Sequence, residues 1–310
     1  MLLVTGGAGF IGSHLIKTLV ERGDRVRVLD NFSTGTMANL AAVAPQIDVI
    51  DGDLRDAAVV RRAAGGARII FHLAAQASVP RSVADPRETF DVNLTGTLNL
   101  LEAARDEGCQ RVVVASTSAV YGDDPAARKT ETLAPRPLSP YAISKLAAEQ
   151  CCAFFTRVHQ LETVALRYFN VFGPGQRPDS PYAAAIPRFL AALGQDESPV
   201  VFGDGEQTRD FIAIDDVVAA NLLAASVPGI AGRVFNVARG EAVSLNELLA
   251  TLMQLTGSDR PARYDDERIG DIRHSLADIS AARDALGFEP RVTLAEGLRH
   301  LVAAMPAAVE

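Results

Sequence analysis

The sequence predicts an α/β protein built on a doubly wound parallel sheet, followed by a smaller and mostly helical C-terminal lobe. Seven short runs rich in β-branched and apolar residues alternate with longer segments of helical periodicity. This alternation is typical of parallel strands joined by crossover helices. A glycine-rich turn joins the first run to the first helix, and after Gly240 the alternation gives way to helices with explicit start signals.

The predicted strands cover residues 2–5, 26–29, 47–50, 69–73, 112–115, 164–167 and 234–237. Ile11, Leu15 and Leu19 have the spacing of one helix face, and further helices are expected over residues 86–105, 140–158 and 215–225. Residues 173–181 are rich in Pro and Gly and interrupt the alternation before a helix over residues 182–193.

Two capping boxes mark helix starts in the C-terminal part, Ser244 with Glu247 and Thr293 with Glu296. Each contributes about 1 kcal/mol to its helix. We expect residues 1–169 and 212–239 to form the sheet domain, and residues 170–211 and 240–310 to form the smaller lobe. The lobe should lie over the carboxyl edge of the sheet, where open α/β sheets bind ligands.

Composition excludes several classes of protein. The chain has 310 residues, of which 48% are hydrophobic and 22% charged, so a disordered protein is excluded. A net charge of −8 leaves no broad basic surface for nucleic acid. Three cysteines without a C-x-x-C pair and five histidines without ligand spacing predict neither a disulfide framework nor a metal site. The cysteine usage favours a reducing, cytoplasmic setting. No run approaches the roughly 18 apolar residues of a membrane span, so we expect no membrane partner.

Glycines at positions 6, 9 and 12 follow the first strand and open the first helix. This pattern suits a tight turn, close approach of the backbone to a pyrophosphate and close packing of helix on strand, as in a Rossmann-type fold. Asp30 ends the second strand 18 residues after Gly12, where its carboxylate would bind a ribose diol and repel a 2′-phosphate. The pattern favours NAD over NADP, with a purely structural turn and a solvated acid as the alternatives.

A tyrosine and a lysine, Tyr141 and Lys145, lie four residues apart in the helix that follows Ser139. Only three of the 30 basic residues are lysines, so a lysine at this spacing is notable. On one helix face the ammonium would stabilise the phenolate and lower the pKa of Tyr141 toward that of a general base. The alternative is an ordinary surface helix pair.

Several motifs in this order resemble those of one enzyme family. They are the glycine loop 6–12, Asp-Asn at 30–31, Asp-Leu at 53–54, His-Leu-Ala-Ala at 72–75, Asp-Val-Asn at 91–93, residues 116–122, residues 141–145 and Arg-Tyr-Phe-Asn at 167–170. Together they resemble the extended short-chain dehydrogenase/reductases acting on nucleotide sugars. Within that family the chain is most similar to the UDP-hexose 4-epimerases, particularly the UDP-N-acetylglucosamine 4-epimerases, from residue 1 to about residue 298.

The resemblance implies a role for each matching residue. Thr117 would hydrogen-bond the sugar 4-oxygen, Tyr141 would be the base, and Lys145 would bind the nicotinamide ribose. Cofactor contacts are implied for Gly6, Gly9, Phe10, Ile11, Gly12, Asp30, Asn31, Ser33, Thr34, Gly35, Asp53, Leu54, Leu73, Ala74, Ala75, Gln76, Asn93, Thr117, Tyr141, Lys145 and Phe169. Substrate contacts are implied for Thr117, Tyr141, Asn170, Arg209, Arg268, Asp271 and Ser275. Arginine forks suit a diphosphate, although each arginine alone could be a solvated surface residue.

The residues after Thr117 bear on the reaction. In the family, dehydratases carry an Asp-Glu pair there and decarboxylases carry a Glu at the position of Ala119, whereas this chain has Ser118 and Ala119. The resemblance therefore implies epimerisation: hydride leaves C4 for NAD, a 4-keto UDP-sugar turns over, and the hydride returns, with Tyr141 as acid and base and no metal. UDP-glucuronate epimerase or another nucleotide-sugar enzyme is the alternative, and a non-catalytic NAD-binding sensor is a third interpretation.

Two further expectations concern the substrate and the oligomer. Epimerases limited to UDP-glucose and UDP-galactose resemble one another in carrying a bulky aromatic residue where this chain has Ser275, so a 2-acetamido group should be accepted. The alternative is that Ser275 merely packs. The resemblance also implies a homodimer through a four-helix bundle of residues 86–105 and 140–158. Apolar residues at helical spacing are compatible with it, namely Leu94, Leu98, Leu101, Ala147 and Phe154.

Overall fold

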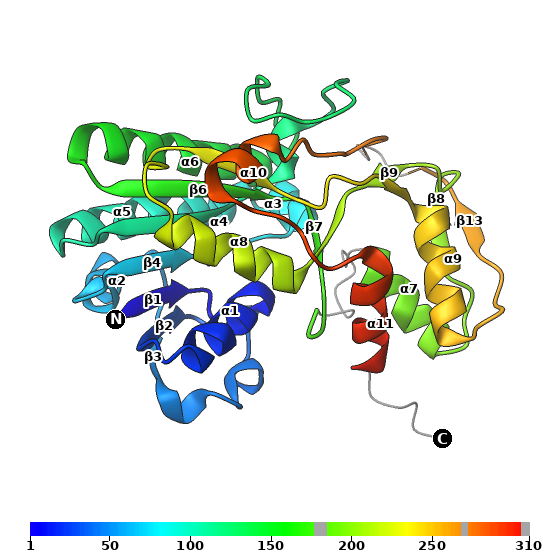
Figure 1. Cartoon of the computed structure of the whole chain (residues 1–310), viewed down its shortest axis with the longest axis horizontal. Coiled ribbons are helices and arrows are strands. Elements are labelled where there is room, and N and C mark those ends of the chain that lie inside the picture. Colours follow the sequence, from blue (N-terminus) through cyan, green and yellow to red (C-terminus); the bar gives the residue numbers. More distant parts are fainter. Residues whose placement is uncertain (177–184, 268–271, 305–310) are drawn as a thin grey trace.

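The computed structural model describes residues 1–176, 185–267 and 272–304, and it places a parallel sheet between two layers of helices (Figure 1). The strands are β1 (Leu2–Thr5), β2 (Val26–Asp30), β3 (Ile47–Asp51), β4 (Ile69–His72), β5 (Arg111–Thr117), β6 (Glu162–Tyr168), β7 (Asn170–Phe172), β8 (Val200–Phe202), β9 (Thr208–Arg209), β10 (Phe211–Ala213), β11 (Val234–Val237), β12 (Val243–Ser244) and β13 (Arg263–Asp265). The α-helices are α1 (Phe10–Glu21), α2 (Ala57–Ala64), α3 (Val79–Ala84), α4 (Pro86–Phe90), α5 (Gly96–Asp106), α6 (Pro140–His159), α7 (Ala185–Gly194), α8 (Ile214–Ser226), α9 (Leu245–Thr256), α10 (Ser280–Leu286) and α11 (Leu294–Ala303). Short turns of other helix types are η1 (Met37–Leu40), η2 (Ala44–Gln46), η3 (Asp91–Thr95) and η4 (Ser118–Tyr121).

Within the described ranges, the main sheet has seven parallel strands in the order β11-β6-β5-β4-β1-β2-β3. Each of the seven predicted strands joins this sheet, which confirms the doubly wound α/β fold. The order reverses direction between β1 and β4, and both strands pair in parallel with Thr5 opposite His72. Ligands in this class of sheet bind at such a reversal, outside the carboxyl ends of the strands.

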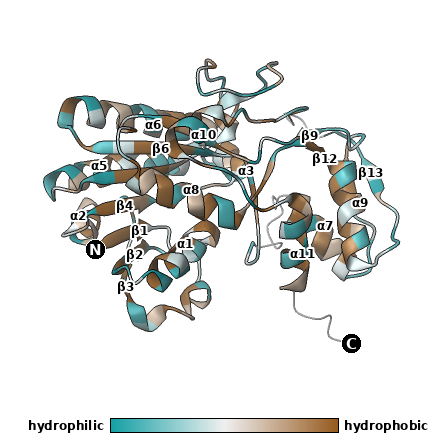
Figure 2. Ribbon diagram, in the orientation of Figure 1, coloured by the Kyte–Doolittle hydropathy of each residue, from teal (hydrophilic) through white to brown (hydrophobic). Residues whose placement is uncertain are grey.

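Side chains alternate between the two faces of the sheet because successive residues of a strand point to opposite sides. On one face, Leu2 and Val4 pack with residues of α1, α8 and α10. On the other face, Leu3 packs with residues of α2, α5 and α6. Figure 2 shows the resulting hydrophobic strands inside the more polar helical layers. Burial on both faces explains why the predicted strands are continuous apolar runs.

The predicted helix over residues 86–105 differs from the observed structure. It is divided into α4, the π-helical turn η3 and α5, and Asn93 lies buried in that turn. A π-turn inserts one extra residue per turn, and such turns are frequent at functional sites. The apolar periodicity continues through the turn, so the sequence alone predicts one uninterrupted helix.

A second core lies beside the sheet and contains α7, α9 and α11, at the right of Figure 1. Both capping boxes form, at Ser244 with Glu247 and at Thr293 with Glu296. Residues of α10 and Phe288 pack instead with α8 and β11 in the core of the sheet. The sequence analysis assigned them to the smaller lobe, because short amphipathic helices look alike whichever core they cover. Among the described residues, no helix is long and apolar enough to cross a membrane.

Candidate active site

The motifs of the sequence analysis meet at the carboxyl edge of the sheet. The glycine loop follows β1, Asp30 ends β2, Asp53 follows β3, residues 73–76 follow β4 and Thr117 ends β5. These segments are brought together because all these strands are parallel and in register.

The glycine loop packs tightly against the segment after β4. Gly6 has a φ of +68°, and a Cβ placed on it would lie 2.6 Å from the Cα of Ala74. A Cβ on Gly12 would collide with the carbonyl of Gly6. Glycine is therefore required at both positions by the backbone.

The first turn of α1 has no side-chain cap and no acidic residue. Within this turn, the backbone N–H groups and the positive end of the helix dipole are therefore not capped by a side chain of the chain's own. Such an arrangement binds a phosphate group.

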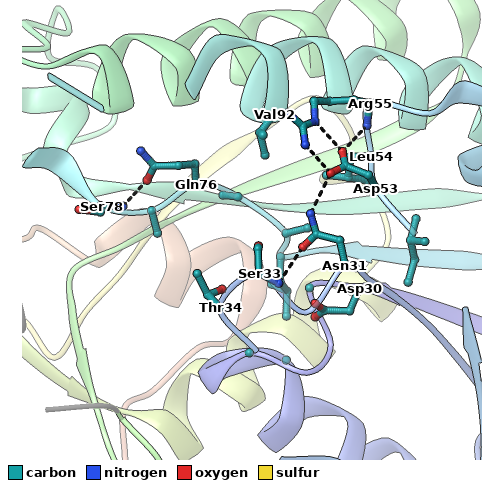
Figure 3. A pocket seen from close by; sticks show the side chains of 18 of the residues that line it. Asp30, Asn31, Ser33, Thr34, Asp53, Leu54, Arg55, Gln76, Ser78 and Val92 are labelled. Atoms are coloured by element: carbon teal, nitrogen blue, oxygen red, sulfur yellow. Dashed lines mark hydrogen bonds and ion pairs between the residues drawn. The ribbon is translucent and has the colours of Figure 1, made fainter. Parts of the chain in front are cut away.

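A pocket of about 420 Å³ opens at this edge (Figure 3). It is lined by fifteen of the predicted cofactor residues, namely Gly6, Gly9, Phe10, Ile11, Gly12, Asp30, Asn31, Ser33, Thr34, Asp53, Leu54, Leu73, Ala74, Ala75 and Gln76. The predicted residues outside the lining are Gly35, Asn93, Thr117, Tyr141, Lys145 and Phe169. Gly35 nevertheless abuts the glycine loop, because a Cβ on it would lie 2.5 Å from the carbonyl carbon of Ala8.

The Asp30 carboxylate is held by the backbone of the loops that frame the pocket. Its oxygens accept hydrogen bonds from the N–H groups of Ala8 and Phe32, each at 2.8 Å. Each oxygen keeps a lone pair for a further donor. An acceptor fixed beside a phosphate-binding helix terminus fits the ribose diol and pyrophosphate of a dinucleotide.

An arginine that the sequence analysis did not identify, Arg55, lines the same pocket. It forms a two-bonded ion pair with Asp53 at 2.9 and 2.7 Å, and Asp53 also accepts a bond from Asn31 (Figure 3). These hydrogen bonds, that of Arg55 first, hold the pKa of Asp53 well below its usual range. Asp53 thus fixes the orientation of Arg55 in the pocket wall.

Other lining residues were also missed: Leu29, Gly52, Ala77, Ser78, Arg81, Glu88 and Val92. Arg81 and Glu88 form an ion pair between α3 and α4 at 2.7 Å. Leu29 and Gly52 directly precede Asp30 and Asp53, and the other five follow the His-Leu-Ala-Ala run. Neither position carries a chemical signal of its own.

The predicted catalytic residues lie next to the pocket. Thr117 ends β5, and its hydroxyl accepts a hydrogen bond from the N–H of Ala119. Tyr141 lies in the first turn of α6, which Ser139 caps through the N–H of Ala142. The Thr117 hydroxyl lies beside the Tyr141 phenol, where it can favour the phenolate.

The pKa of Tyr141 differs from the prediction, which was that the ammonium of Lys145 would lower it. Burial raises the pKa of Tyr141, and the opposing influence comes from the hydrogen bond with Thr117. The Lys145 ammonium donates to the carbonyl of Ala115 at 2.9 Å, and burial lowers the pKa of Lys145 to about 8. The sequence places the two side chains on one helix face, but only the tertiary structure shows that the ammonium is drawn to β5.

A network of buried hydrogen bonds joins the sheet to α6. The Thr97 hydroxyl donates to the carbonyl of Asn93, so His72 Nε2 must donate to Thr97 at 2.9 Å. The Asn93 amide donates to Ser144 at 2.9 Å, and Ser144 donates to the carbonyl of Tyr141 at 2.7 Å. The network fixes the first turn of α6 relative to β4.

The same asparagine reaches the pocket wall. Asn93 accepts from the N–H of Gln76 at 2.8 Å and donates to its carbonyl at 3.0 Å. The π-helical turn therefore turns Asn93 toward both the pocket and α6, which joins the two parts of the predicted site.

The described substrate candidates surround residues 208–210. The N–H of Asn170 donates to the carbonyl of Asp210 at 3.0 Å, and the N–H of Ser275 donates to the carbonyl of Thr208 at 3.1 Å. Arg209 lies between these contacts in β9 and is half-buried. Arg268 and Asp271 lie outside the described residues.

Phe169 follows β6 and is buried, with its ring tilted against that of Tyr121 at 6.3 Å between centroids. It stands at the same edge of the sheet as Thr117, which pairs with Tyr168 across β5 and β6.

Comparison with known proteins agrees with this geometry. The family model described as "NAD dependent epimerase/dehydratase family" matches residues 2–238. The UDP-glucose 4-epimerase of Mycolicibacterium smegmatis is 38% identical, with 97% of this chain and 96% of that protein covered. The UDP-N-acetylglucosamine 4-epimerase from Methanobrevibacter ruminantium, solved with UDP-N-acetylmuramic acid, is 42% identical with a TM-score of 0.94, covering 98% of this chain and 97% of the other.

A second similar structure carries the cofactor. The UDP-glucose 4-epimerase of Thermus thermophilus, solved with NAD, is 37% identical with a TM-score of 0.89, and the match covers 98% of both chains. The family match, the phosphate-binding loop and the position of Asp30 agree with one another. This chain therefore belongs to the NAD dependent epimerase/dehydratase family, and NAD is its cofactor.

Proposed function

We propose that the protein is an isomerase that epimerises a UDP-sugar at C4, with Tyr141 as acid and base. The observation that carries this proposal is the position of the Thr117 hydroxyl beside the Tyr141 phenol, next to the NAD pocket. Similar proteins over nearly the whole chain are UDP-sugar 4-epimerases, which supports the same reaction class.

NAD, when bound, accepts and returns the hydride of C4. The chain's own residues have three tasks in this scheme. Tyr141 takes the proton of the 4-hydroxyl and later returns it, and Thr117 holds the same oxygen. Lys145 binds the nicotinamide ribose through its ammonium. Thr117 and Tyr141 have room for a sugar oxygen, since both residues are partly exposed.

The residues near Thr117 favour a reaction confined to C4. Ser118 and Ala119 stand in η4, next to Thr117, and neither is an acid. Elimination of water or loss of carbon dioxide would need a second proton-transfer group at this place. A cycle of oxidation and reduction at one carbon needs only Tyr141.

We further propose UDP-GlcNAc and UDP-GalNAc as substrates, with UDP-glucose and UDP-galactose as an additional pair at the same site. Ser275 is only 9% exposed and lies beside Arg209, on the segment that pairs with Thr208. A small side chain here leaves room for a 2-acetamido group while the keto-sugar turns over. Arg209 and Arg268 would hold the UDP diphosphate.

Proton NMR of the purified enzyme with UDP-GlcNAc, UDP-glucose and UDP-glucuronate in turn tests the reaction and the substrate together. Conversion at C4 that is lost in Tyr141→Phe is expected. Conversion of UDP-glucuronate alone would contradict the proposed substrates and identify the protein as a UDP-glucuronate epimerase instead. No conversion of any UDP-sugar by protein that binds NAD would instead favour the non-catalytic sensor.

Ser275→Tyr separates the two substrate classes. The variant should lose turnover of the acetylated sugars by at least about tenfold more than turnover of UDP-glucose, because an added ring fills the space for the acetamido group. Equal loss on both classes would show that Ser275 only packs.

The assembly and the division of the chain are proposals as well. We propose a homodimer through α6 and the neighbouring helices, because Ile143, Phe154 and Val158 lie on one face of α6 and are 43%, 46% and 52% exposed. Leu101 is buried in the chain's own core and takes no part in that face. We also propose that residues 1–169 with 212–239 bind NAD, and that residues 170–211 with 240–310 bind the UDP-sugar, although α10 within the last range packs on the sheet.

A further inference from the structure

A buried ion pair lies one helical turn beyond Lys145. Glu149 of α6 and Arg167 of β6 are 3% and 4% exposed. Arg167 donates from Nε and Nη2 to the two carboxylate oxygens of Glu149 at 2.9 and 2.7 Å. The Ser116 hydroxyl donates to the same carboxylate. Glu149 is thus fully engaged from the side of the sheet.

The position of Glu149 makes this arrangement unexpected. A lysine and a glutamate four residues apart on a helix are neighbours and attract each other. Lys145 nevertheless donates to the carbonyl of Ala115 and forms no ion pair with Glu149. A planar guanidinium binds a carboxylate with two parallel hydrogen bonds, so Arg167 holds Glu149 more firmly than an ammonium can.

Among the described residues, Glu149 is also the anion that could form an ion pair with the Lys145 ammonium. The charged or titratable groups that act on Lys145 or feel its charge are Glu149 and Cys152 on α6 and His72 on β4. Burial raises the pKa of Cys152 to about 12 and lowers that of His72 to about 3, so both are neutral at pH 7. Tyr141, one turn earlier on α6, is neutral too, because burial raises its pKa.

Arg167 is itself fixed in place. Its guanidinium carbon lies 4.8 Å from the ring centroid of Tyr121, and the Tyr121 hydroxyl donates to Asn236 at 2.7 Å. Nη1 of Arg167 is buried without a hydrogen-bond partner. A cation held against an aromatic face by a fixed ring has little freedom to release its carboxylate.

We propose that Arg167 is a positioning residue that acts through Glu149: by holding this carboxylate it prevents an ion pair between Glu149 and Lys145, and so keeps the ammonium available to the phenol and the ribose. This inference rests on the proposed function, because it assigns a purpose to an ammonium that is kept out of an ion pair. Without Arg167, Glu149 turns to the cation one turn away. The positive charge of Lys145 is then paired with the carboxylate of Glu149, and the ammonium moves away from Tyr141.

The pKa of Lys145 reports the effect directly, without NAD or substrate. The chain has only three lysines, so protein labelled with ε-¹³C-lysine gives three side-chain signals, which Lys17→Arg and Lys129→Arg assign. Lys145 should titrate near 8 in the NAD-free protein. In Arg167→Met its pKa should rise by at least about one unit, which is tenfold in proton affinity. An unchanged pKa would overturn the proposal.

A double variant distinguishes positioning from a merely structural role. Glu149→Gln with Arg167→Met removes both buried charges, an exchange that folded proteins often tolerate. The pKa of Lys145 should return to the wild-type value or below. Turnover should fall by about tenfold or more in kcat for Arg167→Met, with little change in KM, and recover in the double variant. A double variant as impaired as the single one would refute the mechanism.

Tyr121→Phe is the matched control. It removes the hydroxyl that bonds Asn236 but keeps the aromatic ring against Arg167 and the pair of Arg167 with Glu149, so the pKa of Lys145 should stay unchanged. Wild-type protein that converts no UDP-sugar would refute the proposed function while leaving the lysine titration readable. Active wild-type protein with the same lysine pKa in every variant would refute only the role of Arg167.

Discussion

Replacing Lys145 with methionine should change how the stability of the protein depends on pH. Burial lowers the pKa of Lys145 from 10.5 to about 8. The unfolded chain therefore keeps this proton up to about pH 10.5, whereas the folded chain releases it near pH 8. Because the unfolded state binds more protons in that window, the free energy of unfolding rises with pH across it.

The lowered pKa sets the magnitude. The difference between 10.5 and about 8 corresponds to about 3 kcal/mol of lost stability at pH 7. At pH 9.5 the unfolded lysine is itself close to losing its proton, and about 1 kcal/mol of this lost stability remains. Lys145→Met has no titrating group at this position, so neither penalty applies to it. The difference in free energy of unfolding between variant and wild type should therefore change by about 2 kcal/mol between pH 7 and pH 9.5. The lost hydrogen bond to Ala115 costs about 1–3 kcal/mol. The amine as well as the ammonium can donate it, and the change in its strength is already contained in the lowered pKa.

Urea unfolding of NAD-free protein at pH 7 and pH 9.5 measures this shift. NAD must be removed and the protomer concentration kept constant, because binding of NAD and association of protomers would each add stability to the folded state. Lys17→Met is the control, because Lys17 is exposed on α1 and its removal should leave the pH dependence unchanged. The reasoning fails if Lys145→Met and wild type gain stability in parallel from pH 7 to pH 9.5.

Three further outcomes are expected. Gly35→Ala should weaken NAD binding by about 1–3 kcal/mol in calorimetric titration, because the new Cβ would lie 2.5 Å from the carbonyl carbon of Ala8; unchanged affinity would contradict the tight loop. Burial raises the pKa of Asp210 to about 6, so the folded state binds more protons than the unfolded state between pH 4 and 6. The free energy of unfolding should therefore fall by about 2 kcal/mol through this group as pH rises from 4 to 6. In urea unfolding, Asp210→Asn should lack this fall. Phe154→Glu should convert the proposed dimer to monomers in light scattering, whereas a retained dimer would place the interface elsewhere.

The sheet and most of the lining of the pocket at its carboxyl edge were predictable from local sequence. Seven apolar runs predicted the seven strands, because a strand buried on both faces leaves a continuous signal. The glycine loop and Asp30 were predictable for a similar reason: their roles depend on the backbone close to them in sequence. Arg55 and Arg81 were missed, since their place in the pocket depends on which loops pack together.

The sequence by itself determined the class of fold, the place of the phosphate loop and the helical spacing of Tyr141 and Lys145. Each of these follows from periodicity or from contacts within a few residues. Only the tertiary structure decided what surrounds Lys145. Its ammonium is drawn to β5, and the carboxylate of Glu149 one turn away is held by Arg167 from β6. Electrostatic balance in a buried site depends on charges brought together from distant strands, and no spacing along the chain encodes it.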